Sequence, residues 1–201
     1  MIKFLWVAAC FALALFSYAF CRDKKDWAWL SAGMGFTLLA DYFLVLYDDQ
    51  PPGLAAFCLT HLFYFMRAAG FRYGWIPLAT ALCAAPWASK LGWVAGAGIV
   101  YGLLFIENIA ANAVNLIRNV SRAPRVNRIL TLTGLALFAL CDVNVLLFNL
   151  PRFIDFPLQT AQTAYALIWV FYAPSQLLLA ASAADIPRIR GILFDKNREP
   201  T

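Results

Sequence analysis

Seven apolar stretches follow one another along this chain of 201 residues, with short polar or Gly- and Pro-containing segments between them. A helix needs about 20 predominantly apolar residues to cross the hydrocarbon core of a bilayer, and most of these stretches have that length. The third and fourth are close to the short limit. The pattern therefore predicts membrane-spanning helices. The stretches are Ile2–Phe20, Trp27–Tyr47, Leu54–Ala69, Tyr73–Ala88, Leu91–Ile117, Ile129–Leu150 and Phe156–Ala184.

The composition agrees with a membrane protein, because 63% of the residues are apolar and only 13% are charged. An ordinary soluble domain has roughly 25% charged residues. We therefore expect an all-α fold, a polytopic membrane helix bundle of about seven transmembrane helices. Residues 1–201 would form a single transmembrane domain, with a short basic cytoplasmic tail from about residue 185. The net charge of +5 comes from short loops, so we expect no nucleic-acid partner.

The loop charges predict the orientation, because Lys and Arg are enriched in cytoplasmic loops. With seven helices and the N-terminus outside, thirteen of the sixteen Lys and Arg residues lie inside. Only Lys3, Lys90 and Arg152 lie outside, and the C-terminus is cytoplasmic. The first stretch could instead be a cleaved signal peptide. Cleavage would reverse the charge pattern at two loops, so we expect a retained helix.

Three ionisable side chains fall inside the apolar stretches, where an unpaired polar group costs several kcal/mol. Asp41, His61 and Asp142 lie six to eight residues from the predicted outer ends of the second, third and sixth stretches. At 1.5 Å of rise per residue, all three lie roughly 9–12 Å below the outer boundary. This common depth makes them the candidate functional centre. The alternative is a structural hydrogen-bonded cluster that holds the helices together.

Other polar and aromatic side chains recur at helical spacing near these three. Tyr64 shares a helix face with His61. We expect the stripes to face the bundle interior and to line a polar cavity, although ordinary helix packing is an alternative. Glu107 lies off the stripe of its helix and would pair with a basic group such as Arg118. The stripes are Tyr165, Trp169, Tyr172 and Gln176 in the last stretch, and Tyr101, Asn108, Asn112 and Asn115 in the fifth.

The five cysteines lie within or beside apolar stretches and lack the spacing of metal sites or secreted disulfide scaffolds. We expect no disulfide, no metal and no cofactor. Glycines at positions 92, 96, 98 and 102 predict close helix packing in the fifth stretch. Two carboxyl groups in an apolar environment suit acid–base chemistry, in which one donates a proton and the other stabilises a cation or activates water.

Leu38–Leu44 and Phe57–Tyr64 resemble a Gly-Asp element and a Ser-His-x-x-Tyr element in the following helix, as found in the YhhN-like lysoplasmalogenase family. Gly134–Asp142 resembles a Gly-x-x-x-Phe-x-x-Ser-Asp stretch, and Trp169–Leu178 resembles a closing Tyr-x-x-x-Gln segment. The resemblance covers about Trp27 to Ala184.

The chain departs from the family pattern at Ala40, Thr60 and Cys141, where the family usually has Gly, Ser and Ser. Each departure keeps the polar residue beside it. The family typically has about eight helices and a Lys-Pro motif near the second, which this chain lacks. Altered substrate choice or lost activity would be consistent with these differences.

The resemblance implies an intramembrane lipid hydrolase that cleaves the vinyl ether bond of lysoplasmalogens, with a lysophospholipid as its partner. We expect an integral protein of the bacterial inner (plasma) membrane. A small proton- or cation-coupled transporter, or a lipid-binding membrane protein without hydrolase activity, is the alternative. The implied catalytic residues are Asp41, Asp142 and His61, and the implied substrate-binding residues are Tyr64, Tyr172, Gln176, Tyr101 and Asn108.

Overall fold

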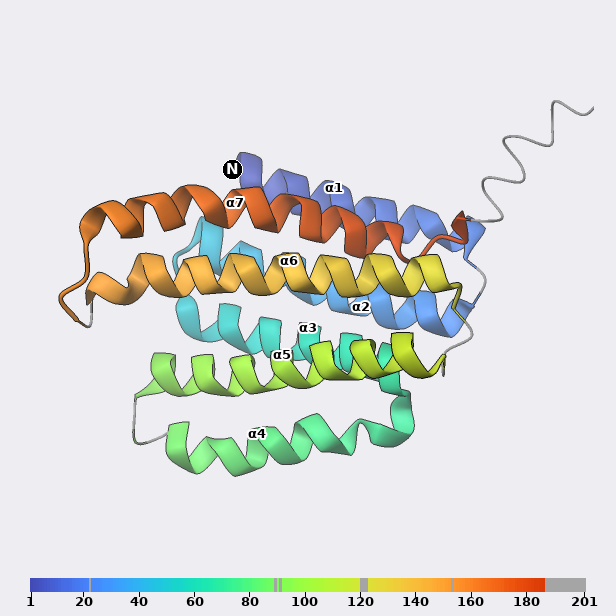
Figure 1. Ribbon diagram of the computed structural model, residues 1–201, viewed down its shortest axis with the longest axis horizontal. Coiled ribbons are helices and arrows are strands. Elements are labelled where there is room, and N and C mark those ends of the chain that lie inside the picture. Colours follow the sequence, from blue (N-terminus) through green and yellow to red (C-terminus); the bar gives the residue numbers. More distant parts are fainter. Residues whose placement is uncertain (22, 89, 91, 120–122, 153, 187–201) are drawn as a thin grey trace, which may run out of the picture.

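The computed structural model describes residues 1–21, 23–88, 90, 92–119, 123–152 and 154–186, and this part of the chain is helical without strands. Its seven α-helices run back and forth along one axis (Figure 1). The all-α prediction is therefore confirmed. The helices are α1 (Ile2–Phe16), α2 (Lys24–Asp41), α3 (Gln50–Ala69), α4 (Trp75–Ala88), α5 (Trp93–Arg118), α6 (Arg125–Asn149) and α7 (Leu158–Ala181).

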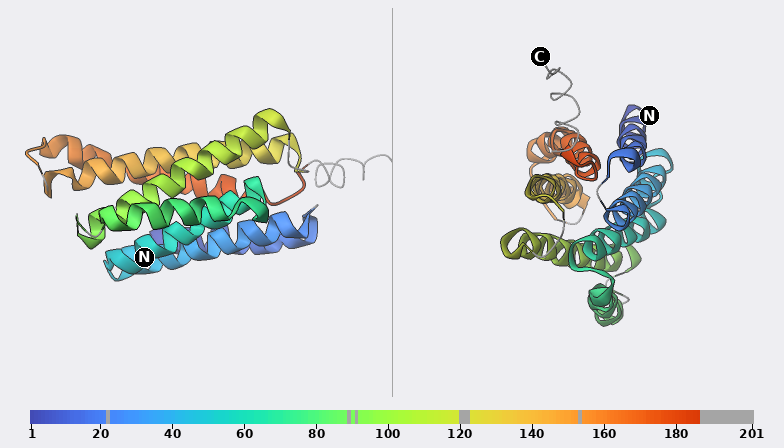
Figure 2. Two further views of the ribbon diagram at one scale, coloured as in Figure 1. Left: turned by 90° about the horizontal axis from the view of Figure 1, so that it is seen from below. Right: turned by 90° about the vertical axis from the view of Figure 1, so that its right-hand side faces the viewer.

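Six of these helices form a closed ring in the order α1, α2, α3, α5, α6, α7 and back to α1. Helix α4 packs against α5 outside the ring, as the end-on view in Figure 2 shows. The buried core lies inside the ring and includes Val7, Leu30, Leu135 and Leu179. The ring interior is therefore the place where polar side chains from several helices can meet.

Within the described residues, five helical segments are long and apolar enough to cross a membrane, which is compatible with an integral membrane protein. The helices α1, α2, α5, α6 and α7 supply them. Helix α4 has 14 residues, or about 21 Å at 1.5 Å per residue, against a hydrocarbon core of about 30 Å. That α3 and α4 cross the membrane stays a prediction, as does the orientation of the chain in it. The tail from residue 187 and Arg22 and Arg122, which entered the charge count, lie outside the described residues.

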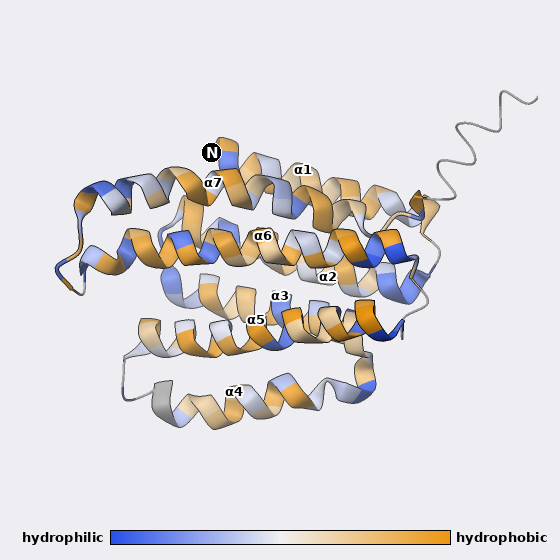
Figure 3. Cartoon of the chain, in the orientation of Figure 1, coloured by the Kyte–Doolittle hydropathy of each residue, from blue (hydrophilic) through white to orange (hydrophobic). Residues whose placement is uncertain are grey.

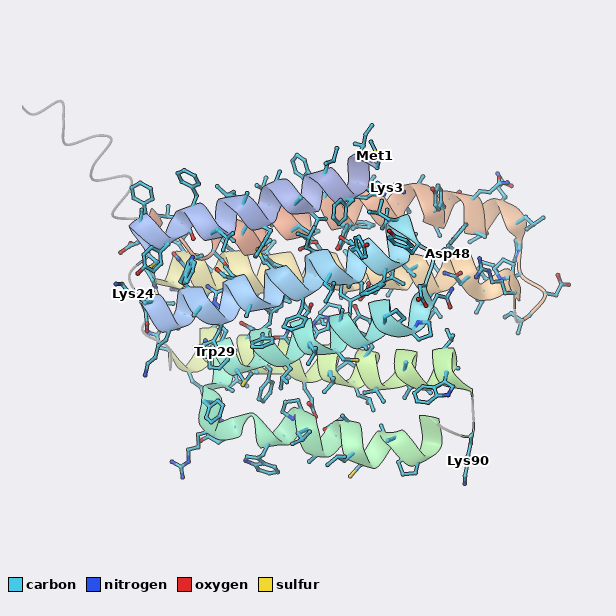
Figure 4. The ribbon with its side chains drawn as sticks, turned by 180° about the vertical axis from the view of Figure 1, so that it is seen from behind. Met1, Lys3, Lys24, Trp29, Asp48 and Lys90 are labelled. Carbon is cyan, nitrogen blue, oxygen red and sulfur yellow. The ribbon has the colours of Figure 1, made fainter. Side chains whose placement is uncertain are left out.

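The two ends of the bundle differ in charge, and Figure 3 shows hydrophilic residues concentrated there. Lys24 marks one end, Asp48 and Lys90 lie at the other, and Lys3 lies in the half of the bundle toward Asp48 (Figure 4). We call these the Lys24 end and the Asp48 end. Among the described residues, the Lys and Arg side chains of the Lys24 end are Lys24, Lys25, Arg67, Arg72, Arg118, Arg125 and Arg128, and those of the half toward Asp48 are Lys3, Lys90 and Arg152.

Two helix ends explain how the chain positions Asp41. Helix α2 begins after Asp23, whose carboxylate accepts a hydrogen bond from the Lys25 amide at 2.8 Å and so caps the helix. It ends at Asp41 and continues as a π-helical turn over Tyr42–Leu46. Helix α3 begins at Gln50, four residues before the predicted apolar stretch, because prolines are tolerated in the first helical turn.

Close helix contacts form at glycines other than the predicted ones. A Cβ atom at Gly33 would lie 2.3 Å from the Tyr64 ring, and one at Gly134 would lie 2.9 Å from Leu179. In contrast, a Cβ atom at Gly98 or Gly102 would meet nothing within 4 Å. The predicted close packing at these two α5 glycines is therefore wrong. The tight contacts are instead α2 against α3 and α6 against α7.

Candidate active site

Asp41, at the end of α2, lies inside the ring with 5% of its surface exposed. The Tyr172 hydroxyl of α7 donates a 2.7 Å hydrogen bond to its Oδ2 atom. This bond crosses the ring, since α2 and α7 are not neighbours in it. The π-helical turn begins at the next residue, and such turns occur frequently at functional sites.

Asp142, in the middle of α6, has the same kind of partner. The Tyr101 hydroxyl of α5 donates a short hydrogen bond to its Oδ2 atom. Asp142 is only half-buried, whereas Asp41 is buried. Each carboxyl group is therefore hydrogen-bonded by a tyrosine from another helix, Asp41 by Tyr172 and Asp142 by Tyr101.

His61, on α3, is fully buried and stacks on Phe105 of α5, with ring centroids 4.1 Å apart. The Asn108 amide nitrogen lies 3.1 Å from its Nδ1 atom, and the Asn112 amide donates to Asn108 Oδ1 at 2.8 Å. Because the Asn108 oxygen is engaged by Asn112, its amide group donates to Nδ1. A neutral His61 ring then carries its proton on Nε2, a buried atom without a hydrogen-bond partner among the described residues.

Two aromatic residues, Phe138 of α6 and Tyr101 of α5, connect these three groups. The Phe138 ring lies 5.6 Å from the His61 ring and 5.5 Å from the Tyr172 ring, measured between centroids. The His61 ring also lies 5.1 Å from the ring of Tyr101, whose hydroxyl bonds Asp142. The predicted convergence is thus present as a common neighbourhood. We call Asp41, His61 and Asp142, with Tyr101 and Tyr172, the acid cluster.

The remaining predicted residues, two binding residues and the α7 stripe, divide between the interior and the surface. Tyr64 and Gln176 are buried, and Gln176 Oε1 has no hydrogen-bond partner among the described residues. Tyr64 packs over Gly33. Tyr165 is 50% exposed, so the prediction that the whole α7 stripe faces inward is wrong. Tyr172 and Gln176 lie in the core, Trp169 is partly buried against it, and Tyr165 lies at the surface.

Glu107 does not have the predicted partner. Thr80 of α4 donates a short hydrogen bond to its Oε1 atom. Glu107 therefore ties the outlying helix to the ring instead of pairing with Arg118. The position of Glu107 away from the asparagine stripe was the sequence signal that it faces another helix.

The arrangement has the donors and acceptors for acid–base chemistry. In the described part of the chain, no three His, Cys, Asp or Glu residues are grouped so that they could hold a metal ion. Asp41 and Asp142 can each exchange a proton with a bound molecule, and their tyrosine partners keep the carboxyl groups oriented. The aromatic rings around His61 exclude water, which strengthens electrostatic interactions at the site.

A second polar group, at the Lys24 end, was not predicted. All five N–H donors of Arg67 are used. Two contact Asp26, at 2.9 and 2.8 Å, and the others contact Thr131 Oγ1, Ser182 Oγ and Ser182 O at 3.3, 2.8 and 2.9 Å. We call Asp26, Arg67, Thr131 and Ser182 the arginine cluster. It joins α2, α3, α6 and the end of α7, and the only hint in the sequence was an arginine inside an apolar stretch.

Comparison with known proteins gives one match. The model of the YhhN family matches residues 2–183. No curated protein and no solved structure matches the chain. The matched segment includes both clusters and every predicted site residue.

Proposed function

Since the chain belongs to the YhhN family, we propose that it hydrolyses the vinyl ether bond of lysoplasmalogens. The products are a fatty aldehyde and a glycerophospho-alcohol. The observation that supports this most directly is the pair of carboxyl groups, each hydrogen-bonded by a tyrosine hydroxyl from another helix. Paired carboxyl groups are the means by which glycosidases stabilise an oxocarbenium-like transition state.

Cleavage requires one proton and one water molecule. The acid transfers its proton to the vinyl carbon remote from the ether oxygen, and the carbon attached to that oxygen becomes an oxocarbenium ion. Water adds to this carbon and loses a proton to the second carboxylate, which gives a hemiacetal. The hemiacetal then gives its hydroxyl proton to the first carboxylate and becomes the aldehyde. Its bond to the glycerol oxygen breaks as that oxygen takes the proton from the second carboxyl group and leaves as the alcohol.

We assign the two carboxyl groups different roles. Asp142 is the less buried residue of the two, and we assign it the role of the base that activates water. Asp41 then donates the proton to carbon, and the Tyr172 hydroxyl holds its carboxyl group in place. The Nε2–H group of His61 has no partner among the described residues and can donate a hydrogen bond to the glycerol oxygen as it leaves.

One assay tests the proposal. The purified protein is incubated with a lysoplasmalogen, and aldehyde release is measured for the wild type, Asp41→Asn and Asp142→Asn. Asp48→Asn is the matched control, because Asp48 is an exposed carboxylate beyond the same helix end. We expect release by the wild type and the control and its loss in the other two. No release by the wild type, or full release by both substituted proteins, would reject the hydrolase.

A further inference from the structure

We propose that Lys3 binds the phosphate of the substrate head group, an inference that rests on the proposed function. Lys3 lies in the first turn of α1, in the half of the bundle toward Asp48 (Figure 4). Its ammonium nitrogen lies 4.7 Å from the centre of the Tyr165 ring and 5.1 Å from the centre of the Trp169 ring. These two aromatic residues belong to α7, so Lys3 lies where α1 and α7 meet.

The Lys3 ammonium group has unused capacity to bind an anion. It donates a hydrogen bond to the Tyr165 hydroxyl at a long 3.5 Å. The only ion pair within 4.0 Å in the described part of the chain joins Arg67 to Asp26, so no described carboxylate pairs with Lys3. Three N–H donors on a half-buried ammonium group suit a phosphate oxygen.

A chain of contacts leads from Lys3 to the acid cluster. The Trp169 ring lies 5.6 Å from the Tyr172 ring, and the Tyr172 hydroxyl bonds Asp41. Lys3 is therefore linked to the edge of the acid cluster through the Trp169 and Tyr172 rings of α7.

The separation suits a lysophospholipid. From Tyr165 to Tyr172, α7 rises about 10 Å, at 1.5 Å per residue. An extended glycerophosphate unit and its vinyl group can span that length. A phosphate at Lys3 would thus place the vinyl ether at Asp41, with the apolar tail deeper between the helices. The exposed Tyr165, which does not belong to the interior, then acquires a role as part of the head-group site.

The first experiment separates head-group binding from chemistry. Lys3→Gln, Lys3→Arg and the wild type are compared on a lysoplasmalogen and on the phosphate-free 1-alkenylglycerol with the same chain. Lys90→Gln is the matched control, a lysine in the same half of the bundle but in the α4–α5 connection (Figure 4). The rate of aldehyde release gives kcat and KM for each protein with each substrate.

For the phosphorylated substrate, we expect Lys3→Gln to raise KM about 10- to 100-fold, the size of one charge-assisted hydrogen bond, with kcat nearly unchanged. Lys3→Arg should restore most of the affinity. On the alkenylglycerol, wild type and Lys3→Gln should have equal KM values. An unchanged KM in Lys3→Gln, or an equal rise for both substrates, would overturn the head-group site.

A binding measurement distinguishes this failure from failure of the proposed function. A non-hydrolysable alkyl lysophospholipid should raise the Tm of the detergent-solubilised wild type and of Lys90→Gln, but raise that of Lys3→Gln less. The alkylglycerol should stabilise all three proteins equally. If wild type releases no aldehyde while these shifts are found, the hydrolase fails and the head-group site stands. If inorganic phosphate at the same concentration reproduces the lipid's shift, Lys3 binds free anions and the lipid head-group site fails.

Discussion

The acid cluster and the arginine cluster are both polar groups between apolar helices, but they satisfy their hydrogen-bonding atoms to different degrees. In the arginine cluster, Arg67 uses every donor and its charge is balanced by Asp26. In the acid cluster, His61 Nε2 has no partner among the described residues. The described partners of the two carboxyl groups are neutral tyrosines.

This difference separates two uses of buried polar groups. A cluster whose donors and acceptors all have partners within the protein joins helices, and its hydrogen bonds stabilise the fold. A cluster with unused donors and uncompensated acids costs stability in the free protein, and that cost is typical of sites that bind or react. The asparagines of α5 connect the two, because Asn112 bonds Asn108 beside His61 and also lines a recess with Arg67.

The largest effect should follow from neutralising the acid cluster. Asp41→Asn or Asp142→Asn should each lower aldehyde release about 10²- to 10⁴-fold, as expected for a general acid or base. The double variant should fall little further, because groups that act as a unit are non-additive. Unfolding in SDS should show unchanged or increased stability, since each substitution removes a buried acid. Additive losses would mean that the two carboxyl groups act independently.

Breaking the arginine cluster should lower stability rather than directly remove a catalytic group. Arg67→Met leaves Asp26 without its counter-ion and should lower the free energy of unfolding by about 3–5 kcal/mol. Arg72→Met, an exposed arginine just beyond the same helix, is the control and should stay near wild type. Asp26→Asn combined with Arg67→Met should recover part of the loss. A normally stable Arg67→Met protein with reduced activity would reverse the roles that we assign to the clusters.

The tyrosines of the acid cluster should have an intermediate effect. Tyr172→Phe and Tyr101→Phe each remove a hydrogen bond to a carboxyl group, worth about 1.5–3 kcal/mol. We expect kcat to fall about 10- to 100-fold, which corresponds to that energy. Tyr47→Phe, whose hydroxyl bonds Tyr42 at the surface, is the control. If Tyr172→Phe retains full kcat, Tyr172 does not position Asp41.

The smallest effect should follow from releasing α4. Thr80→Val removes the hydrogen bond to Glu107, and such bonds within membranes are worth about 0.6 kcal/mol on average. Because α4 lies outside the ring, aldehyde release should not change. SDS unfolding and the activity assay check both expectations, with Thr163→Val as a control at an exposed threonine. A marked loss of activity would extend the site to α4.

The sequence predicted the common depth of Asp41, His61 and Asp142, because helical rise depends only on position along an apolar stretch. It also predicted that Tyr172 and Gln176 lie on one face. It did not predict which tyrosine bonds which acid, since that depends on how each helix is rotated against its neighbours. The prediction that Tyr165 faces the interior was wrong for the same reason. One face of a helix can be buried along part of its length and exposed along the rest.

The sequence pattern did not predict contacts between segments that are far apart in the chain. Arg67 and Asp26 are 41 residues apart, and nothing in the spacing of either segment indicates the other. Glu107 was expected to pair with a charge, but the ring order places α4 beside it and makes Thr80 its partner. The α5 glycines looked like a packing motif, yet two of them face open space. In each case the contact partner depends on which helices are neighbours in space.

The π-helical turn after Asp41 has a consequence for the history of the chain. Such a turn holds one residue more than an α-helical path through the same space. A relative without that residue can keep its aspartate and the following loop in place by closing the turn into a regular helix. Alignments of such relatives would then show a one-residue gap within Tyr42–Leu46. The π-helical turn would then be the structural trace of a one-residue insertion beside Asp41.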